Sequence, residues 1–229
     1  MPRHGSSICR RGAIIWAATP RRTSLTHTPI SDPTRRALLA GFAAAAALPL
    51  IPTPARALSQ GEASQLIGEV MAEVQGIINS GGSESQMIAR FENLFSRYAD
   101  VPVIARSALG PPARAATPAQ LSAFTDAFRS YLARKYGRQF RSFIGASTQV
   151  EGARQVQTVI EVRSTMLMRG EAPFTVLWHV SDRSGRPLFV NIIIDGVNVL
   201  AAERQEIGTL LERRGGNIDA MIEDLRRAG

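Results

Sequence analysis

The sequence predicts an α+β domain in which helices pack on one four-stranded antiparallel sheet. Three observations predict it. Apolar residues recur every three or four positions from about 59 to 143, and they alternate with polar residues from about 148 to 194. The helical period then returns from about 198 to the end of the chain. Helices, a meander of strands and further helices, in that order, are typical of this fold class.

Residues 1–57 are typical of an export leader and not of a folded unit. The pair Arg35-Arg36 is followed by an alanine-rich apolar stretch, 40–48, then by prolines and by the small-residue site Ala55-Arg56-Ala57. The paired arginines indicate the twin-arginine route. The apolar stretch is shorter than the roughly 20 residues of a membrane span.

Cleavage after Ala57 is expected to release a single periplasmic domain, residues 58–229. Residues 1–30 lengthen the leader beyond what export needs, so translation starting nearer the arginine pair is an alternative interpretation of the N-terminus.

The net charge of +8 does not indicate a nucleic-acid partner, because it lies in the leader. Eight of the 27 Lys and Arg residues and one of the 19 acidic residues fall within 1–57, which leaves 19 basic and 18 acidic residues in the domain. A nearly neutral domain is not expected to bind nucleic acid. Cys9, the single cysteine, also lies in the leader, so the domain has no disulfide and no thiolate metal site.

The first helical region divides into four predicted helices. The first covers 59–78 and is ended by the sequence Ser-Gly-Gly-Ser at 80–83, where the second begins and continues to residue 98. A short helix is expected at 101–108, before a Gly-Pro-Pro sequence. A Thr-Pro pair then starts a long helix with an aromatic stripe, 117–143.

The strands are predicted from alternation and the last helices from the return of the helical period. A turn-forming sequence at 181–185 separates the third strand from the fourth, which is almost continuously apolar and is expected to be covered on both faces. The predicted strands are 148–151, 156–163, 174–180 and 188–194, and the closing helices are 198–213 and 216–227.

The domain carries no sequence motif for nucleophilic, phosphate-binding or metal chemistry. His179 is its single histidine and has no second ligand at metal spacing, so no metal and no cofactor is expected. A carboxylate pair such as Asp100 with Glu161 remains open, because carboxylate chemistry leaves little trace in a sequence. The basic flank 134–141 is either a docking surface for anionic groups or a solvated helix face, and we favour the solvated face.

Three groups of residues carry a resemblance to a known family. The first reads Y-A-D-V-P, I-A-R and L-G within 98–110, and the second reads T-P-A-Q with aromatic residues within 117–132. The third reads I-D-G-V followed by Arg, Glu-Ile and Gly within 194–215. In this order and spacing they resemble the MlaC, or toluene-tolerance, family. This chain has Asn191 and Asn198 where that family often has aspartate and serine, and prolines where it often has tryptophan.

The resemblance implies a non-enzymatic periplasmic carrier of phospholipid, with an apolar cavity between sheet and helices that takes the acyl tails. Such a cavity is needed because two tails cost on the order of 20 kcal/mol to expose in water. The partners implied are phospholipid, an inner-membrane ABC lipid transporter and an outer-membrane lipoprotein complex. The candidate tail contacts are Ile104, Leu109, Phe124, Phe128, Tyr131, Leu132, Val176, Trp178, Ile192 and Ile194.

Other functions stay open from the residues alone. An apolar cavity selects poorly among chains, so another apolar lipid such as a hopanoid is an alternative cargo. A small α+β enzyme with a buried carboxylate and an adaptor with an ordinary filled core are the alternatives from other classes. A Phe-rich helical stripe is in most proteins simply core.

Overall fold

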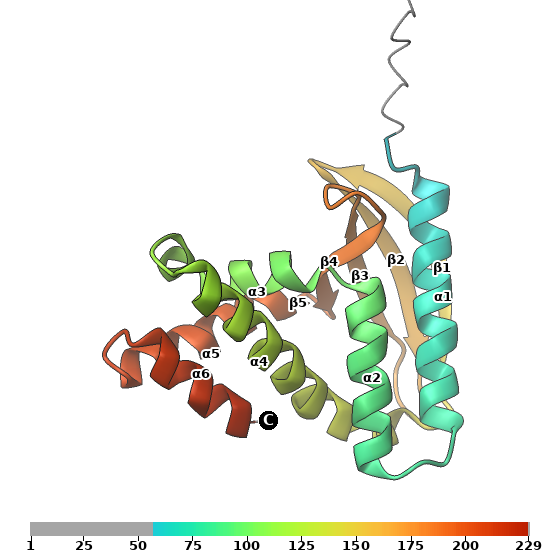
Figure 1. Ribbon diagram of the computed structural model, residues 1–229. Coiled ribbons are helices and arrows are strands. Elements are labelled where there is room, and N and C mark those ends of the chain that lie inside the picture. Colours follow the sequence, from blue (N-terminus) through green and yellow to red (C-terminus); the bar gives the residue numbers. More distant parts are fainter. Residues whose placement is uncertain (1–56, 229) are drawn as a thin grey trace, which may run out of the picture. The chain divides into compact units, whose positions relative to one another are not determined.

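The computed structural model describes residues 57–228, which form six α-helices and one antiparallel sheet (Figure 1). The predicted α+β fold class is confirmed. The sheet has five strands in the order β1-β2-β3-β4-β5, one more than predicted, because a two-residue strand pairs with the end of β4. The predicted leader lies outside the described residues except for Ala57.

The helices and strands have the following bounds. The helices are α1 (Gln60–Asn79), α2 (Glu84–Tyr98), α3 (Val101–Leu109), α4 (Pro118–Gly137), α5 (Val199–Arg213) and α6 (Ile218–Arg227), with 3₁₀ turns η1 (Pro111–Arg114) and η2 (Arg138–Phe143). The strands are β1 (Ser147–Val156), β2 (Val159–Leu167), β3 (Phe174–Ser181), β4 (Leu188–Ile194) and β5 (Val197–Asn198).

Capping boxes fix the starts of α1, α2 and α4. In each, a Ser or Thr side chain accepts a hydrogen bond from the backbone N–H three residues on, and a Glu or Gln side chain returns to the cap. The predicted starts of these helices are therefore confirmed. The long helix was predicted to reach Phe143 but its α-helical part ends at Gly137, and a 3₁₀ turn continues it. Glycine has a low helix propensity, which favours an end there.

The strand predicted at 156–163 is wrong in its first part. Val156 is the last residue of β1 and pairs with Val159, the first residue of β2. Between them Gln157, with φ of 51°, and Thr158 form a two-residue hairpin turn. Because such a turn preserves the period of two, alternation continues through it and does not reveal the reversal. β1 is consequently longer than the strand predicted at 148–151.

One face of the sheet is packed and the other is not. On the packed face, alternate residues of β2 and β3 such as Val162, Trp178 and Val180 are buried and pair across the strands. The helix α1 packs against β1 and β2, and α3 and α5 contact β4 (Figure 1). We call this packed side the inner face. The opposite side, the outer face, carries charged residues of β1 and β2, among them Glu151 and Arg163.

The strand β4 is not covered on both faces as predicted. Leu188 and Phe189 are buried, whereas the residues that follow are half-buried and Ile194 is exposed. The prediction fails because α3 and α5 contact β4 but leave residues 190–194 partly or fully exposed.

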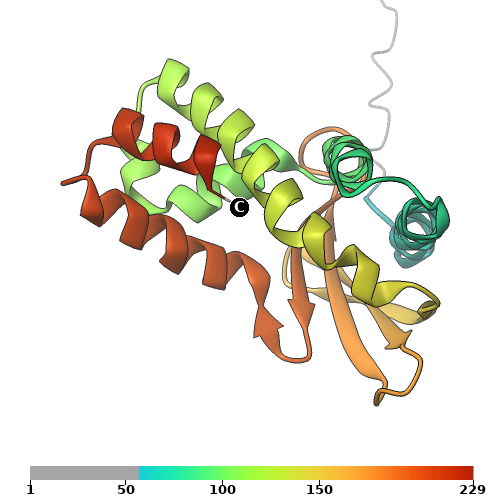
Figure 2. The same cartoon turned by 90° about the horizontal axis from the view of Figure 1, so that it is seen from below.

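The helices α3, α4, α5 and α6 form a second group beside the sheet, with α4 contacting α2, α3 and α6 (Figure 2). Phe124 and Phe128 of α4 have no exposed surface and lie in a core cluster that also includes residues of α1, α3, the strands and α6. Within residues 57–228, no helix is both long and apolar enough to cross a membrane.

Candidate functional site

Most of the predicted tail contacts lie in one continuous apolar cluster. The side chains of Phe124 and Phe128 stack with ring centroids 5.5 Å apart, and Phe128 meets Tyr131 at 6.2 Å. Eight of the ten residues are buried, and all eight belong to the same cluster: Ile104, Leu109, Phe124, Phe128, Tyr131, Leu132, Val176 and Trp178.

The other two predicted contacts, Ile192 and Ile194, lie where the inner face becomes exposed. Ile192 pairs with Trp178 across the strands and is half-buried, while Ile194 pairs with Val176 and has 38% of its surface exposed. Two further half-buried apolar residues of this face pair with each other, Met166 of β2 and Phe174 of β3. We call Met166, Phe174, Ile192 and Ile194 the apolar margin.

The start of α5 is tied to the strand that carries the margin. The side-chain oxygen of Asn191 accepts hydrogen bonds from the backbone N–H of Leu200, at 3.3 Å, and of Ile192, at 2.9 Å. Asn198 caps α5 by accepting from the N–H of Ala201 at 3.0 Å. Both asparagines that depart from the family pattern therefore serve as hydrogen-bond acceptors that position α5.

A polar cluster joins α5 to α4 next to this attachment. The ammonium group of Lys135 donates to Oε1 of Glu203 at 2.7 Å and to the hydroxyl of Tyr131 at 2.9 Å, and Tyr136 donates to the same Oε1 at 2.6 Å. Lys135 also lies 5.2 Å and 5.7 Å from the ring centroids of Tyr131 and Tyr136. We call Tyr131, Lys135, Tyr136 and Glu203 the α4–α5 cluster.

The acidic residue of the α4–α5 cluster, Glu203, is buried. Glu203 is 1% exposed, and within residues 57–228 its Oε2 is a buried oxygen that accepts no hydrogen bond. Burial lowers the pKa of Lys135, but its hydrogen bonds to Glu203 and Tyr131, together with the charge of Glu203, outweigh that effect and raise the pKa. Burial raises the pKa of Tyr131 and of Tyr136. At neutral pH the lysine is therefore charged and both tyrosines are neutral.

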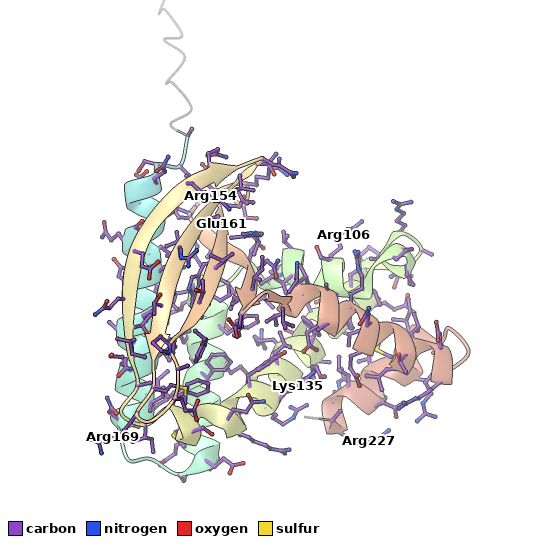
Figure 3. The ribbon with its side chains drawn as sticks, turned by 180° about the vertical axis from the view of Figure 1, so that it is seen from behind. Arg106, Lys135, Arg154, Glu161, Arg169 and Arg227 are labelled. Atoms are coloured by element: carbon purple, nitrogen blue, oxygen red, sulfur yellow. The ribbon has the colours of Figure 1, made fainter. Side chains whose placement is uncertain are left out.

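The sequence prediction missed this cluster and misjudged the basic flank. Lys135 (Figure 3) was placed on a solvated helix face, yet it is partly buried and pairs with the buried Glu203. Arg134, on the same flank, donates to the backbone oxygens of Leu225 and Ala228 and so caps α6. Arg138 does lie in solvent, paired with Glu84. A signal for Glu203 was present, because it interrupts the apolar stripe of α5 between Leu200 and Ile207.

The carboxylates considered for catalysis have separate structural partners. Asp100 caps α3 by accepting from the N–H of Val103 at 3.3 Å, and it accepts a hydrogen bond from Ser184. Glu161 accepts from Arg154 at 2.8 Å (Figure 3), and its other oxygen lies 3.3 Å from Nε2 of His179. Burial opposes ionisation of Glu161, but hydrogen bonds from Arg154 and His179 lower its pKa.

Two open hollows lie away from the predicted contacts. One, of about 470 Å³, is on the outer face and is lined by Glu151, Arg154, Glu161 and Arg163 among others. The other, of about 360 Å³, lies between α1 and α2. Within residues 57–228, no three His, Cys, Asp or Glu side chains come close enough together to hold a metal ion.

The chain is similar to a known protein family and to a protein of known structure. The family model of the MlaC protein matches residues 65–227. Among solved structures, the fold is similar to that of a phospholipid-binding protein from Ralstonia solanacearum in complex with a phospholipid. The two chains are 21% identical with a TM-score of 0.64, over 72% of this chain and 95% of the other.

Proposed function

The chain belongs to the MlaC family, as its sequence motifs predicted, and we propose on that premise that it is a non-enzymatic carrier of phospholipid. The observation that carries the proposal is the family match over nearly all of the described domain. The likeness of the fold to a protein solved with a phospholipid supports it. Both fit a domain whose inner sheet face is apolar and partly exposed.

The apolar margin is the proposed entrance for the acyl tails. A carrier has to remove the tails from water, because each exposed methylene costs about 0.8 kcal/mol. Ile192 and Ile194 continue the apolar surface of Trp178 and Val176 toward solvent. Tails that enter here would part α4 from the start of α5 and reach the buried contacts predicted from the sequence, Phe124 to Leu132 of α4 and Ile104 and Leu109 of α3.

Export and exchange complete the proposed function. The twin-arginine leader would deliver the domain to the periplasm, with cleavage after Ala57 giving the mature chain 58–229. There the carrier would shuttle phospholipid between an outer-membrane lipoprotein complex and an inner-membrane ABC lipid transporter. These partners are those implied by the family resemblance.

Lipid analysis of the native protein tests the proposal. The mature domain is purified from the periplasm without lipid-stripping detergent, and its organic extract is quantified by mass spectrometry. We expect close to one phospholipid per chain. A hopanoid or another apolar lipid in its place would show that the protein carries a different cargo. An empty protein that also fails to take phospholipid from vesicles would refute lipid carriage. Turnover of the offered lipid would indicate an enzyme.

A further inference from the structure

We infer that the α4–α5 cluster is a headgroup site, selective for phospholipids whose headgroup carries a hydrogen-bond donor in addition to its phosphate. This inference rests on the proposed function and specifies the cargo. Phosphatidylethanolamine, with its primary ammonium, belongs to the selected class. Phosphatidylcholine, whose quaternary ammonium has no N–H, does not.

The hydrogen-bonding capacity that the cluster leaves unused defines the ligand. An ammonium group has three donors, and Lys135 uses two of them, on Tyr131 and Glu203. The hydroxyl of Tyr131 accepts from Lys135, and within residues 57–228 it donates to no acceptor. Two donors are therefore free, from Lys135 and Tyr131, and they suit the oxygens of a phosphate.

The unused acceptor is on the other side of the cluster. Oε1 of Glu203 takes the hydrogen bonds of both Lys135 and Tyr136, while Oε2 takes none although it is buried. An unpartnered buried carboxylate oxygen is costly, so a fold that keeps one is expected to fill it with a donor. The torsion that turns a carboxylate is soft, and Lys135, with 34% of its side chain exposed, connects the cluster to solvent.

Charge excludes a simple anion as the preferred ligand. The cluster holds one cation, Lys135, and one anion, Glu203, so a bare phosphate would meet attraction and repulsion together. A group with phosphate at one end and a donor at the other matches both. Phosphoethanolamine has this form, and its ammonium would complete the shell of Oε2.

The cluster lies beside the proposed entrance for the tails. Glu203 lies one helical turn after Leu200, and the backbone N–H of Leu200 donates to the side chain of Asn191 on β4. Asn191 is followed directly by Ile192 of the apolar margin. Tyr131 packs its ring on Phe128, a predicted tail contact. A lipid with tails against the margin would thus have its headgroup near Lys135 and Glu203.

A competition experiment tests the headgroup assignment. Delipidated protein is incubated with vesicles of equimolar palmitoyl-oleoyl phosphatidylethanolamine and phosphatidylcholine, re-isolated, and its bound lipids are quantified by mass spectrometry. We expect the ethanolamine lipid to exceed the choline lipid by about tenfold in the wild type, the scale of one charge-assisted hydrogen bond. Because the tails are identical, the ratio reports the headgroup alone.

The variant Glu203→Gln turns the free acceptor into a donor while preserving shape. We expect its ratio of ethanolamine to choline lipid to fall to near one, because only the ethanolamine lipid loses a hydrogen bond. Glu212→Gln removes the same charge farther along α5, at an exposed position, and should keep the wild-type ratio. Tyr131→Phe removes a phosphate donor and should lower the loading of both lipids severalfold, which provides a second readout if the Glu203 variant does not fold.

The outcomes separate this inference from the proposed function. Equal amounts of the two lipids on the wild type would overturn the headgroup site and leave carriage intact. No lipid of either kind would overturn carriage itself. Titration with O-phosphoethanolamine, which has the headgroup without tails, is the second arm. Tight binding of that compound together with a lipid ratio of one would reassign the cluster to a soluble phosphate compound and overturn the inference.

Discussion

Replacing Ile192 with tryptophan should weaken lipid loading without unfolding the domain. Ile192 belongs to the apolar margin, is half-buried, and pairs with Trp178 across the inner face. A buried position would resist a larger side chain at a cost of about 1–3 kcal/mol. Because Ile192 has solvent on one side, a tryptophan there can turn outward along the margin, and we expect a cost below 1 kcal/mol.

The effect on the cargo is expected to be larger than the effect on the fold. A tryptophan at the entrance would occupy surface that the tails need. If it keeps about two methylenes out of the apolar space, the loss is about 1.6 kcal/mol, or about fifteenfold in affinity. Loading is measured by mass spectrometry after exposure to phospholipid vesicles, and stability by urea unfolding of the delipidated protein.

A neighbouring residue provides the matched control. Ile193 precedes Ile194 on the same strand, pairs with Leu177 and points to the outer face. Ile193→Trp should load lipid as the wild type does. Undiminished loading of Ile192→Trp, or equal losses in the two variants, would refute the assignment of the inner face. Leu132→Trp is a harsher test, because Leu132 is buried and the same insertion should lower stability as well.

Three further predictions concern export, capping and pH. Arg35→Lys combined with Arg36→Lys should leave the precursor in the cytoplasm, and periplasmic processing on fractionation would disprove the twin-arginine assignment. Asp100→Ala should lower the free energy of unfolding by about 1–2 kcal/mol in urea, since it removes the cap of α3; an unchanged midpoint would show that the cap is dispensable. Burial raises the pKa of Glu161, but hydrogen bonds from Arg154 and His179 outweigh burial and hold the pKa below its ordinary 4.5. The ionised Glu161 therefore stabilises the fold above pH 4.5, and this stabilisation is lost as the pH falls through the lowered pKa. The difference in urea midpoint between wild type and Glu161→Gln should accordingly shrink on acidification below pH 4.5, and a constant difference would contradict this.

The sequence predicted the elements whose periodicity is bounded by clear signals. Capping residues and a Thr-Pro pair located the starts of α1, α2 and α4, and the apolar run 188–194 matched β4 at both ends. The β1–β2 turn was missed because a two-residue turn does not interrupt alternation. The exposure of β4 was also misjudged, since composition does not show whether a helix covers a given face.

In the candidate site, too, the residues that follow local sequence patterns could be predicted, and those brought together only by the fold could not. Apolar stripes are local patterns, so residues such as Phe128 and Trp178 could be selected from sequence and do lie in one cluster. Lys135 and Glu203 are 68 positions apart, and only the meeting of α4 with α5 brings them together. A charge within an apolar stripe indicates that a partner is needed, but it does not identify the partner.

Lipid entry is expected on the side of α5, because contacts there are easier to replace than those on the side of α1 and α2. Where α4 passes α2, a Cβ added at Gly137 would lie 2.9 Å from Ile88, so the two helices are in close apolar contact. At its other flank α4 is bridged to α5 by the long polar side chains of Lys135 and Tyr136 to Glu203. Separating the first pair would expose apolar surface to water, whereas a headgroup or water can replace the hydrogen bonds of the second. A tail arriving at the apolar margin would therefore part α4 from the start of α5 and leave the sheet with α1 and α2 in place.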